Sequence, residues 1–320
     1  MRRFVILSCV IGLLAVAAPA GAVTLGVIGS PSRMNDQTAQ KSGAVLRFTG
    51  WGGGWRWGRN FAGLFDFGKR TPVFSFGTHT HSGTREAISP RRIANGYGDG
   101  YLIAMNKAIA DYGRPIYIRP MAEMNGHWNF YCAFNSNGTS RGSSHSTKSF
   151  RLAFKRIYVI LHGGDVATMN ARFANWGVRK LQSDRLTLAE NAYPTLKVLW
   201  NPQGFGSPDI RANSADAYYP GNKYVDVVGD DIYDQGGRYE YDAMVDLYRA
   251  YRGKPFAIGE FGLWNLDHPR FVQDIATFIK NHPRTELAVF NRAESGSIFD
   301  LGNKSRSRAA YKRYLTPLGN

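Results

Sequence analysis

The chain has 320 residues, of which 43% are hydrophobic, 13% aromatic and 20% charged, and it carries a formal net charge of +16. This composition predicts a folded protein with a large core, and it excludes wholesale disorder, a collagen and a coiled coil. No second apolar run long enough to span a bilayer follows the N-terminus, which excludes a multi-pass membrane protein.

The N-terminus has the pattern of a secretory signal peptide. Arg2 and Arg3 precede the apolar run FVILSCVIGLLAVAA, and Ala20-Gly21-Ala22 supplies the small residues of a cleavage site. We therefore expect residues 1–22 to be removed on export, and residues 23–320 to act outside the cell or in a periplasm. A retained membrane anchor is the less favoured alternative, because the run is short and no stop-transfer charge follows it.

The positive charge of the chain is spread rather than concentrated. Removal of Arg2 and Arg3 with the signal lowers the net charge by two to +14, and the remaining basic residues lie mostly in isolated pairs, with a looser cluster from Lys304 to Arg313. We expect no nucleic-acid partner and no membrane contact after signal removal, but solubility or attraction to an acidic glycan or cell-wall surface. Cys132 would be the only cysteine of the mature chain, so no intrachain disulfide can form.

Short β-branched or aromatic runs alternate with amphipathic helical segments along the chain. Several runs are apolar almost throughout, as in parallel strands that are covered on both faces. One helix is expected from Asp99, as its N-cap, to Gly113, as its C-cap. Further helices are predicted at 147–161, 240–251, 270–280 and 306–315. The predicted strands are 24–29, 44–51, 72–77, 115–121, 197–202, 225–233, 256–262 and 287–291.

This alternation predicts a (β/α)8 TIM barrel, an α/β fold, that forms a single catalytic domain over residues 23–320. A doubly wound open sheet is the alternative, but the segment GVIGSPS after the first strand matches a phosphate-binding glycine loop poorly. Between the fourth and fifth strands, residues 128–196 are expected to hold one helix and an insertion. The first part of that insertion, residues 135–149, is predicted to be an exposed, mobile loop.

Acidic residues follow two of the predicted strands. The fourth strand runs into RPMAEMNGHW, which carries Glu123, and the seventh runs into AIGEFG, which carries Glu260. Because barrel enzymes place catalytic groups at the carboxyl ends of strands, we expect both side chains at the barrel mouth. A retaining glycosidase needs such a pair, one acid to protonate the leaving oxygen and one carboxylate to attack the sugar. A single strand-end glutamate is more often a structural ion-pair partner, but the pair and its aromatic neighbours favour catalysis.

These segments resemble glycoside hydrolase family 26, the β-mannanase family, whose catalytic acids follow the fourth and seventh strands. RPMAEMNG is similar to the family's acid/base segment and AIGEFG to its nucleophile segment. YPGNKYVDVVGDDIYD (219–234) is similar to the sixth-strand signature, and LWNP (199–202) to the fifth. The resemblance extends over roughly residues 95–315.

The resemblance implies that Glu123 is the general acid/base, that Glu260 is the nucleophile, and that Tyr233 hydrogen-bonds the nucleophile. It implies a retaining hydrolase without a cofactor, acting on a β-linked polysaccharide, with mannan the foremost substrate. Asp231 would bind a sugar hydroxyl and Arg119 would brace the carboxylates. Two tryptophans would stack on sugar faces. The substrate-binding candidates are Arg119, Asn125, Trp128, Asp231, Tyr233, Trp264 and His79.

Two other interpretations stay open. The family has a histidine directly before the acid/base glutamate where this chain has Ala122, so a carbohydrate-binding pseudoenzyme on the same barrel is one alternative. His79 and His81 form an H-x-H pair after the third strand, which would suit a metal-dependent hydrolase if other ligands joined them. We expect no metal, because the remaining histidines lie elsewhere in the chain. A serine hydrolase is disfavoured because the chain has no G-x-S-x-G segment.

Overall fold

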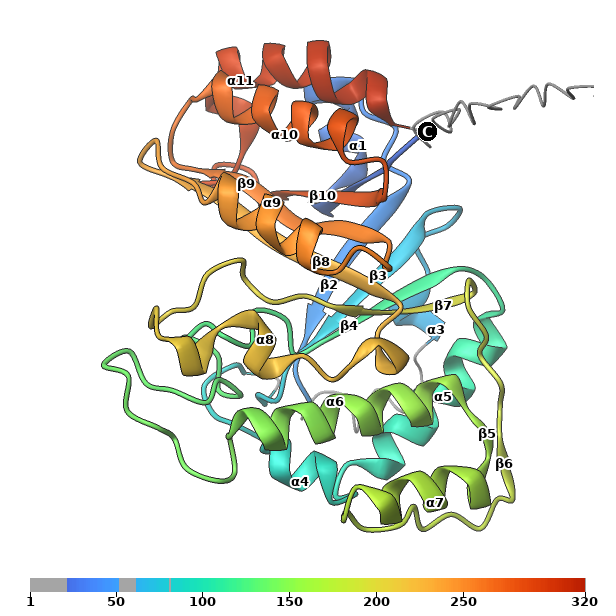
Figure 1. The fold of residues 1–320 in the computed structure, drawn as a ribbon. Helices are drawn as coiled ribbons and strands as arrows, with labels where there is room; N and C mark the ends of the chain where they lie inside the picture. The colour runs from blue at the N-terminus through green and yellow to red at the C-terminus, as the bar shows by residue number, and fades with distance from the viewer. Residues whose placement is uncertain (1–21, 52–61, 81, 320) are drawn as a thin grey trace, which may run out of the picture.

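Parallel strands close into a barrel in the computed structural model, which describes residues 22–51, 62–80 and 82–319 (Figure 1). The order around the barrel is β1-β10-β9-β8-β7-β4-β3-β2, and the ring closes where β1 pairs with β10. This confirms the predicted (β/α)8 barrel and excludes an open sheet. Its eight strands are β1 (Thr24–Gly29), β2 (Ala44–Thr49), β3 (Thr71–Phe76), β4 (Ile116–Pro120), β7 (Leu196–Trp200), β8 (Val227–Gln235), β9 (Phe256–Trp264) and β10 (Thr285–Ala293).

The strands are largely apolar, except for the polar residues of the site, because most of their residues are covered on both faces. One set of side chains fills the inside of the barrel, and a larger set packs between the strands and the helices. In β7, for example, Leu199 belongs to the interior set while Val198 and Trp200 belong to the outer one. The interior set is Ala44, Leu46, Val73, Tyr117, Leu199, Val227, Ala257, Leu287 and Val289.

The predicted long helices are confirmed to within a residue or two. Two details differ, at the start of the helix that begins at Asp99 and at the end of the last helix. Asp99 is the first residue of its helix rather than the N-cap, and its carboxylate instead accepts hydrogen bonds from Arg156. Gly113 closes that helix in the left-handed conformation, as predicted. The last helix ends at Ala310 and continues as a π-helical turn, Tyr311–Leu315. The helices are α1 (Pro31–Thr38), α3 (Ala62–Phe65), α4 (Pro90–Ala94), α5 (Asp99–Tyr112), α6 (Thr147–His162), α7 (Val166–Asn175), α8 (Ala215–Tyr218), α9 (Tyr241–Ala250), α10 (Pro269–Asn281) and α11 (Ser305–Ala310).

The stretch between β4 and β7 is more ordered than the sequence suggests. It holds two helices, α6 and α7, not one, and a two-stranded antiparallel ribbon of β5 (Gly164–Asp165) and β6 (Thr187–Leu188). Asp165 caps α7 by accepting a hydrogen bond of 2.7 Å from the main chain of Thr168. The segment 135–149 is largely exposed, as predicted, and Arg141 ties it to the main-chain carbonyls of Asn129 and His127.

An irregularity between β8 and β9 shapes the mouth of the barrel. Asp230 pairs with Ile258, but the next residue, Asp231, pairs with Glu260, so β9 carries Gly259 as an extra residue. Such a bulge re-aims the side chains beside it. It brings Asp231 and Glu260 level with each other at the carboxyl ends of their strands.

Candidate active site

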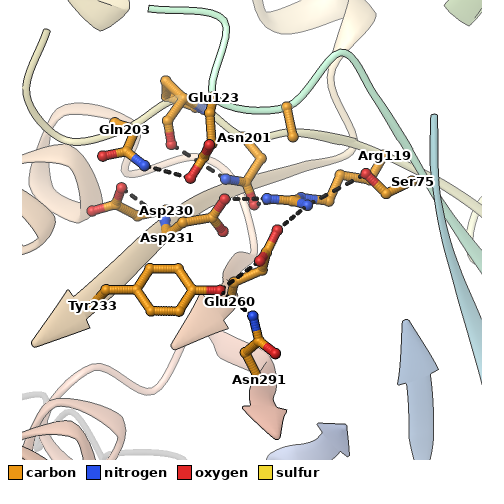
Figure 2. Close-up of polar contacts among 12 residues, drawn as sticks. Ser75, Arg119, Glu123, Asn201, Gln203, Asp230, Asp231, Tyr233, Glu260 and Asn291 are labelled. Carbon is orange, nitrogen blue, oxygen red and sulfur yellow. Dashed lines mark hydrogen bonds and ion pairs between the residues drawn. The ribbon is translucent and has the colours of Figure 1, made fainter. Parts of the chain in front are cut away.

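A buried arginine organises the carboxyl end of the barrel (Figure 2). Arg119, at the end of β4, is 1% exposed. It forms ion pairs with Asp231 of β8 and, at 2.6 Å, with Glu260 of β9. Neutral acceptors take further guanidinium hydrogens, namely Asn201 at 3.2 Å and Ser75 at 3.3 Å. Five barrel positions are thereby joined through one cation, which fixes the carboxylates relative to one another.

Glu260 accepts hydrogen bonds at both of its carboxylate oxygens. Oε1 faces Arg119, and Oε2 accepts a hydrogen bond of 2.6 Å from the Tyr233 hydroxyl. Asn291 of β10 donates in turn to that hydroxyl at 2.8 Å, which orients the phenol (Figure 2). Glu260 is 7% exposed, and it lines a cavity at the barrel mouth. Its surroundings are those of a carboxylate held in one orientation.

Glu123 follows β4 on a strained segment of main chain. Met121 and Glu123 have positive φ angles of 50° and 51°, a conformation that residues other than glycine rarely adopt. Two contacts hold Glu123 there: its amide donates to the Asn201 carbonyl at 2.7 Å, and Asn129 donates to its carbonyl at 2.9 Å. Tyr131 also donates a 2.6 Å hydrogen bond to the carbonyl of Ala122. The segment is therefore fixed without the histidine that Ala122 replaces.

The side chain of Glu123 has neutral donors only. Trp128 donates from its indole nitrogen at 2.7 Å, and the Gln203 amide donates at 2.5 Å. Burial and the charge of Glu260 raise the pKa of Glu123, and Arg119 with these two donors opposes the rise only in part. The two glutamates therefore differ in their partners: Glu260 contacts the guanidinium of Arg119, and Glu123 contacts neutral donors only.

Two aspartates of β8 add negative charge to the same site. Burial raises the pKa of Asp230 to about 8, although Oδ1 accepts main-chain hydrogen bonds from Gly204 at 2.8 Å and Asp231 at 2.9 Å. Burial, with the charges of Glu260 and Glu123, also raises the pKa of Asp231, against the lowering effect of Arg119. Although burial alone lowers it, the charges of Asp231 and Glu260 raise the pKa of Arg119, so the guanidinium stays charged. Arg119 thus contacts two of the four carboxyl groups, Asp231 and Glu260, and burial raises the pKa of Asp230, Asp231 and Glu123.

A cavity of about 650 Å³ opens over these groups. Glu123 and Glu260 both line it, together with Asp231 and Tyr233. Trp128 is 49% exposed and Trp264 is 45% exposed, and both lie on its wall. Carboxylates between exposed aromatic rings suit a sugar, whose apolar faces pack on the rings.

Three predicted substrate-binding residues do not line this cavity. Arg119 is buried beneath it and contacts carboxylates instead, and the other two lie further away. Asn125 is fully buried, and its amide holds the loop after β7 by bonding the main chain of Gln203 at 2.9 Å and of Phe205 at 3.0 Å. His79 is partly buried beside Gly50 and Gly77, and it is not among the residues that line the cavity. Burial lowers the pKa of His79, which favours a neutral ring. His81 lies outside the described residues.

The described part of the chain offers neither a metal-binding group of side chains nor a membrane-spanning helix. Among residues 22–51, 62–80 and 82–319, no group of three or more His, Cys, Asp or Glu side chains is arranged to hold a metal ion. Within the same ranges no helix combines the length and the apolar character that a bilayer crossing requires.

Several residues of the site escape a search for acids at strand ends. Gln203 contacts Glu123, and Asn201 and Ser75 contact Arg119, but each lies far from its partner in sequence. Asn201 lies in LWNP, a segment that resembles the fifth strand of the family, but the resemblance alone assigns it no role. Asp230 is next to a predicted site residue, and only its burial distinguishes it.

Comparison with known proteins agrees with this geometry. The model of glycosyl hydrolase family 26 matches residues 200–283, which contain Asp231, Tyr233 and Glu260. The chain resembles that family. No curated protein sequence matches the chain.

Solved structures share the barrel at low sequence identity. A mannanase from Bacillus subtilis superposes with a TM-score of 0.55 and 18% identity, covering 92% of this chain and 85% of that one. A GH26 β-mannanase from Bacteroides ovatus gives a TM-score of 0.56 and 13% identity over 92% of this chain and 88% of the other. At such identities the likeness establishes the fold. The family match and the barrel together support a glycoside hydrolase, with its substrate left open.

Proposed function

We propose that the chain is a secreted retaining glycoside hydrolase that cleaves a β-linked polysaccharide internally, with mannan as the favoured substrate. The observation that carries this proposal is the placement of Glu123 and Glu260 on one cavity with unlike partners. A double displacement needs one carboxyl group that holds a proton and one that is ionised. The raised pKa of Glu123 suits the first role, and the contact of Glu260 with Arg119 suits the second.

In the first step, a Glu260 carboxylate oxygen bonds to the anomeric carbon as the glycosidic bond breaks. Glu123 donates its proton to the departing oxygen. The Tyr233 hydroxyl and Arg119 keep the nucleophile turned towards the sugar. In the second step, Glu123 accepts a proton from water, the water oxygen bonds to the anomeric carbon, and the bond to Glu260 breaks. The sugar leaves with its original anomeric configuration.

Mannan is favoured because the family description and the named structural relatives point to mannanases. The cavity supports a sugar ligand of some kind, since Trp128 and Trp264 offer exposed faces beside the carboxylates. Export rests on the signal-like pattern of residues 1–22, most of which lie outside the described residues.

The decisive experiment measures reducing ends released by residues 23–320 from mannan, xylans, β-glucans and an acidic glycan. Glu260→Ala should abolish release, and circular dichroism should show that the variant is still folded, because Asp231 remains as a partner of Arg119. Glu123→Ala should keep far more activity on aryl glycosides with good leaving groups than on polymer, since only poor leaving groups need the proton. Proton NMR of the first product should show retained configuration.

Three outcomes would contradict the proposal. Release that survives Glu260→Ala would remove Glu260 from the nucleophile role. An inverted first product would exclude the double displacement. Folded protein that binds a glycan but cleaves none would favour a carbohydrate-binding protein on this barrel, as the departure at Ala122 allows.

A further inference from the structure

A second cavity, of about 750 Å³, lies on the outside of the barrel and shares no lining residue with the catalytic one. Its walls come from α4, from the turn after it, from the loop before α6 and from the segment after α7. No carboxylate lines it. We call it the basic groove, and its lining residues are Arg91, Arg92, Asn95, Tyr97, Ser144 and Arg179.

The three arginines of the basic groove are exposed and have only neutral partners. Arg91 donates to the Ser143 hydroxyl at 3.1 Å, and Arg179 donates to Gln182 at 2.9 Å. The Arg92 guanidinium lies 4.8 Å from the centre of the Tyr97 ring. None of the three forms an ion pair within the ranges that the structure describes. Their charges are therefore available to a ligand.

A buried ion pair beneath the basic groove holds its walls in place. Arg156 of α6 is fully buried and binds Asp99 of α5 through two hydrogen bonds, of 2.7 and 2.6 Å. Its remaining guanidinium nitrogen donates to the main-chain carbonyl of Arg179 at 2.7 Å and of Ala94 at 3.3 Å. Asp99 is also close enough for its charge to interact with Arg179, but both of its oxygens are occupied by Arg156. The main chain that carries the exposed arginines is thus fixed before any ligand arrives.

Tyr97 adds an aromatic face to this cationic surface. Its side chain is 63% exposed and lines the groove. The main chain holds it at this position, because its amide donates to the Arg92 carbonyl at 3.1 Å. A tyrosine face packs against the apolar face of a sugar, while a guanidinium binds a carboxylate or a sulfate through paired hydrogen bonds.

We propose that the basic groove is a secondary binding site for an anionic polysaccharide, separate from the polymer that the catalytic cavity receives. The catalytic cavity is lined by five acidic residues, Glu123, Asp230, Asp231, Glu240 and Glu260, against one arginine, Arg238, which makes it the poorer site for a polyanion. The groove, with three cations and no carboxylate, attracts one. Binding there holds the protein on a matrix that contains acidic chains, whatever reaction the other cavity performs. The net charge of +16 supports the approach of such a matrix.

The test is affinity electrophoresis of the full-length mature protein through gels that contain polygalacturonate, dextran sulfate or neutral mannan. We expect retardation by a polyanion that weakens as salt rises, because salt screens exposed charges. The triple variant Arg91→Gln, Arg92→Gln, Arg179→Gln should bind about tenfold more weakly or worse. Tyr97→Ala leaves the charge unchanged, and its weaker binding would report the contact with the sugar face. Stronger retention by polygalacturonate or by dextran sulfate identifies carboxylate or sulfate as the anionic group.

A matched control removes the same charge elsewhere on the surface. Arg70, Arg252 and Arg313 are exposed and lie outside the groove, and their triple change to Gln should leave binding unaltered. Equal losses in the two triple variants would show an effect of net charge alone and overturn the proposal. So would an absence of retardation by both polyanions, or tighter groove-dependent binding of duplex DNA or anionic lipid vesicles. Because the readout is binding, a failure of the proposed hydrolysis would leave this result intact.

Discussion

Arg119 is the residue whose replacement tests the organisation of the site most directly. Arg119→Met keeps an unbranched stem but removes the guanidinium group that contacts Asp231 and Glu260. Removing one partner of a buried ion pair typically costs about 3–5 kcal/mol, because the other charge is left uncompensated. Here the variant leaves Asp231 and Glu260 without the cation that they contact, and it removes the nearby charge that lowers the pKa of Glu123. We therefore expect the free energy of unfolding at neutral pH to fall by about that amount.

The cost of Arg119→Met should depend on pH in a defined direction. The charge of Arg119 lowers the proton affinity of Asp231 and Glu123, so its loss makes the folded protein retain more protons than the wild type. Unfolded Asp and Glu release theirs near pH 4. A folded state that binds more protons than the unfolded state loses stability as pH rises, by about 1.4 kcal/mol per pH unit for each extra proton. The variant should therefore be closest to wild type near pH 4.5 and furthest from it near pH 7.5.

Urea denaturation followed by circular dichroism at these two pH values measures the effect. Arg156→Met is a matched control, because Arg156 is equally buried but pairs with a single carboxylate, Asp99. Its cost at neutral pH should be similar, and its dependence on pH should be shallower. A loss below about 1 kcal/mol for Arg119→Met, or a pH slope no steeper than that of the control, would refute the view that one cation holds the carboxyl cluster together.

Three further changes probe the residues around the cluster. Asp230→Asn should become more stable relative to wild type as pH rises from about 4 towards 8, as measured by urea denaturation. The reason is that the folded carboxyl group keeps its proton up to about pH 8, while the unfolded one loses it near pH 4. A stability difference that does not change with pH would contradict the raised pKa. Tyr131→Phe removes the 2.6 Å hydrogen bond to the carbonyl of Ala122, so the free energy of unfolding should fall by about 1–3 kcal/mol and kcat should fall with it. An unchanged kcat would show that this hydrogen bond does not position Glu123. Gly259→Ala would place a methyl group against Asn201 and 2.8 Å from an oxygen of Asp231, so thermal denaturation should show a lower Tm. A Tm equal to that of the wild type would mean that the bulge relaxes easily.

The barrel and the central carboxylates could be predicted because their signals are local. Most strands are apolar runs, each long helix has a 3.6-residue stripe, Glu123 follows β4, and Glu260 lies within β9 rather than after it. Even the contact of Tyr233 with Glu260 followed from a resemblance between short segments, and the structure places that hydrogen bond at 2.6 Å. Arg119 was expected to brace carboxylates, and it contacts two of them.

The rest of the site depends on contacts between distant segments. Ser75 and Asn291 lie on strands that carried no chemical motif, and only barrel closure brings them to Arg119 and Tyr233. Asn125 shows the opposite case: it sits two residues after Glu123, yet its amide turns away to hold the loop after β7. The ribbon of β5 and β6 has two residues in each strand, too few for any periodic pattern.

The arrangement of donors around the two glutamates explains how one site assigns two roles to the same residue type. Burial raises the pKa of Asp230 to about 8, and it also raises the pKa of Asp231 and Glu123. Arg119 contacts Glu260 and not Glu123, whose donors are the neutral groups of Trp128 and Gln203. Burial and the charge of Glu260 raise the pKa of Glu123, and the charge of Arg119 opposes that rise from a greater distance. The position of a single arginine therefore gives the two glutamates unlike partners, as the proposed roles of nucleophile and acid require.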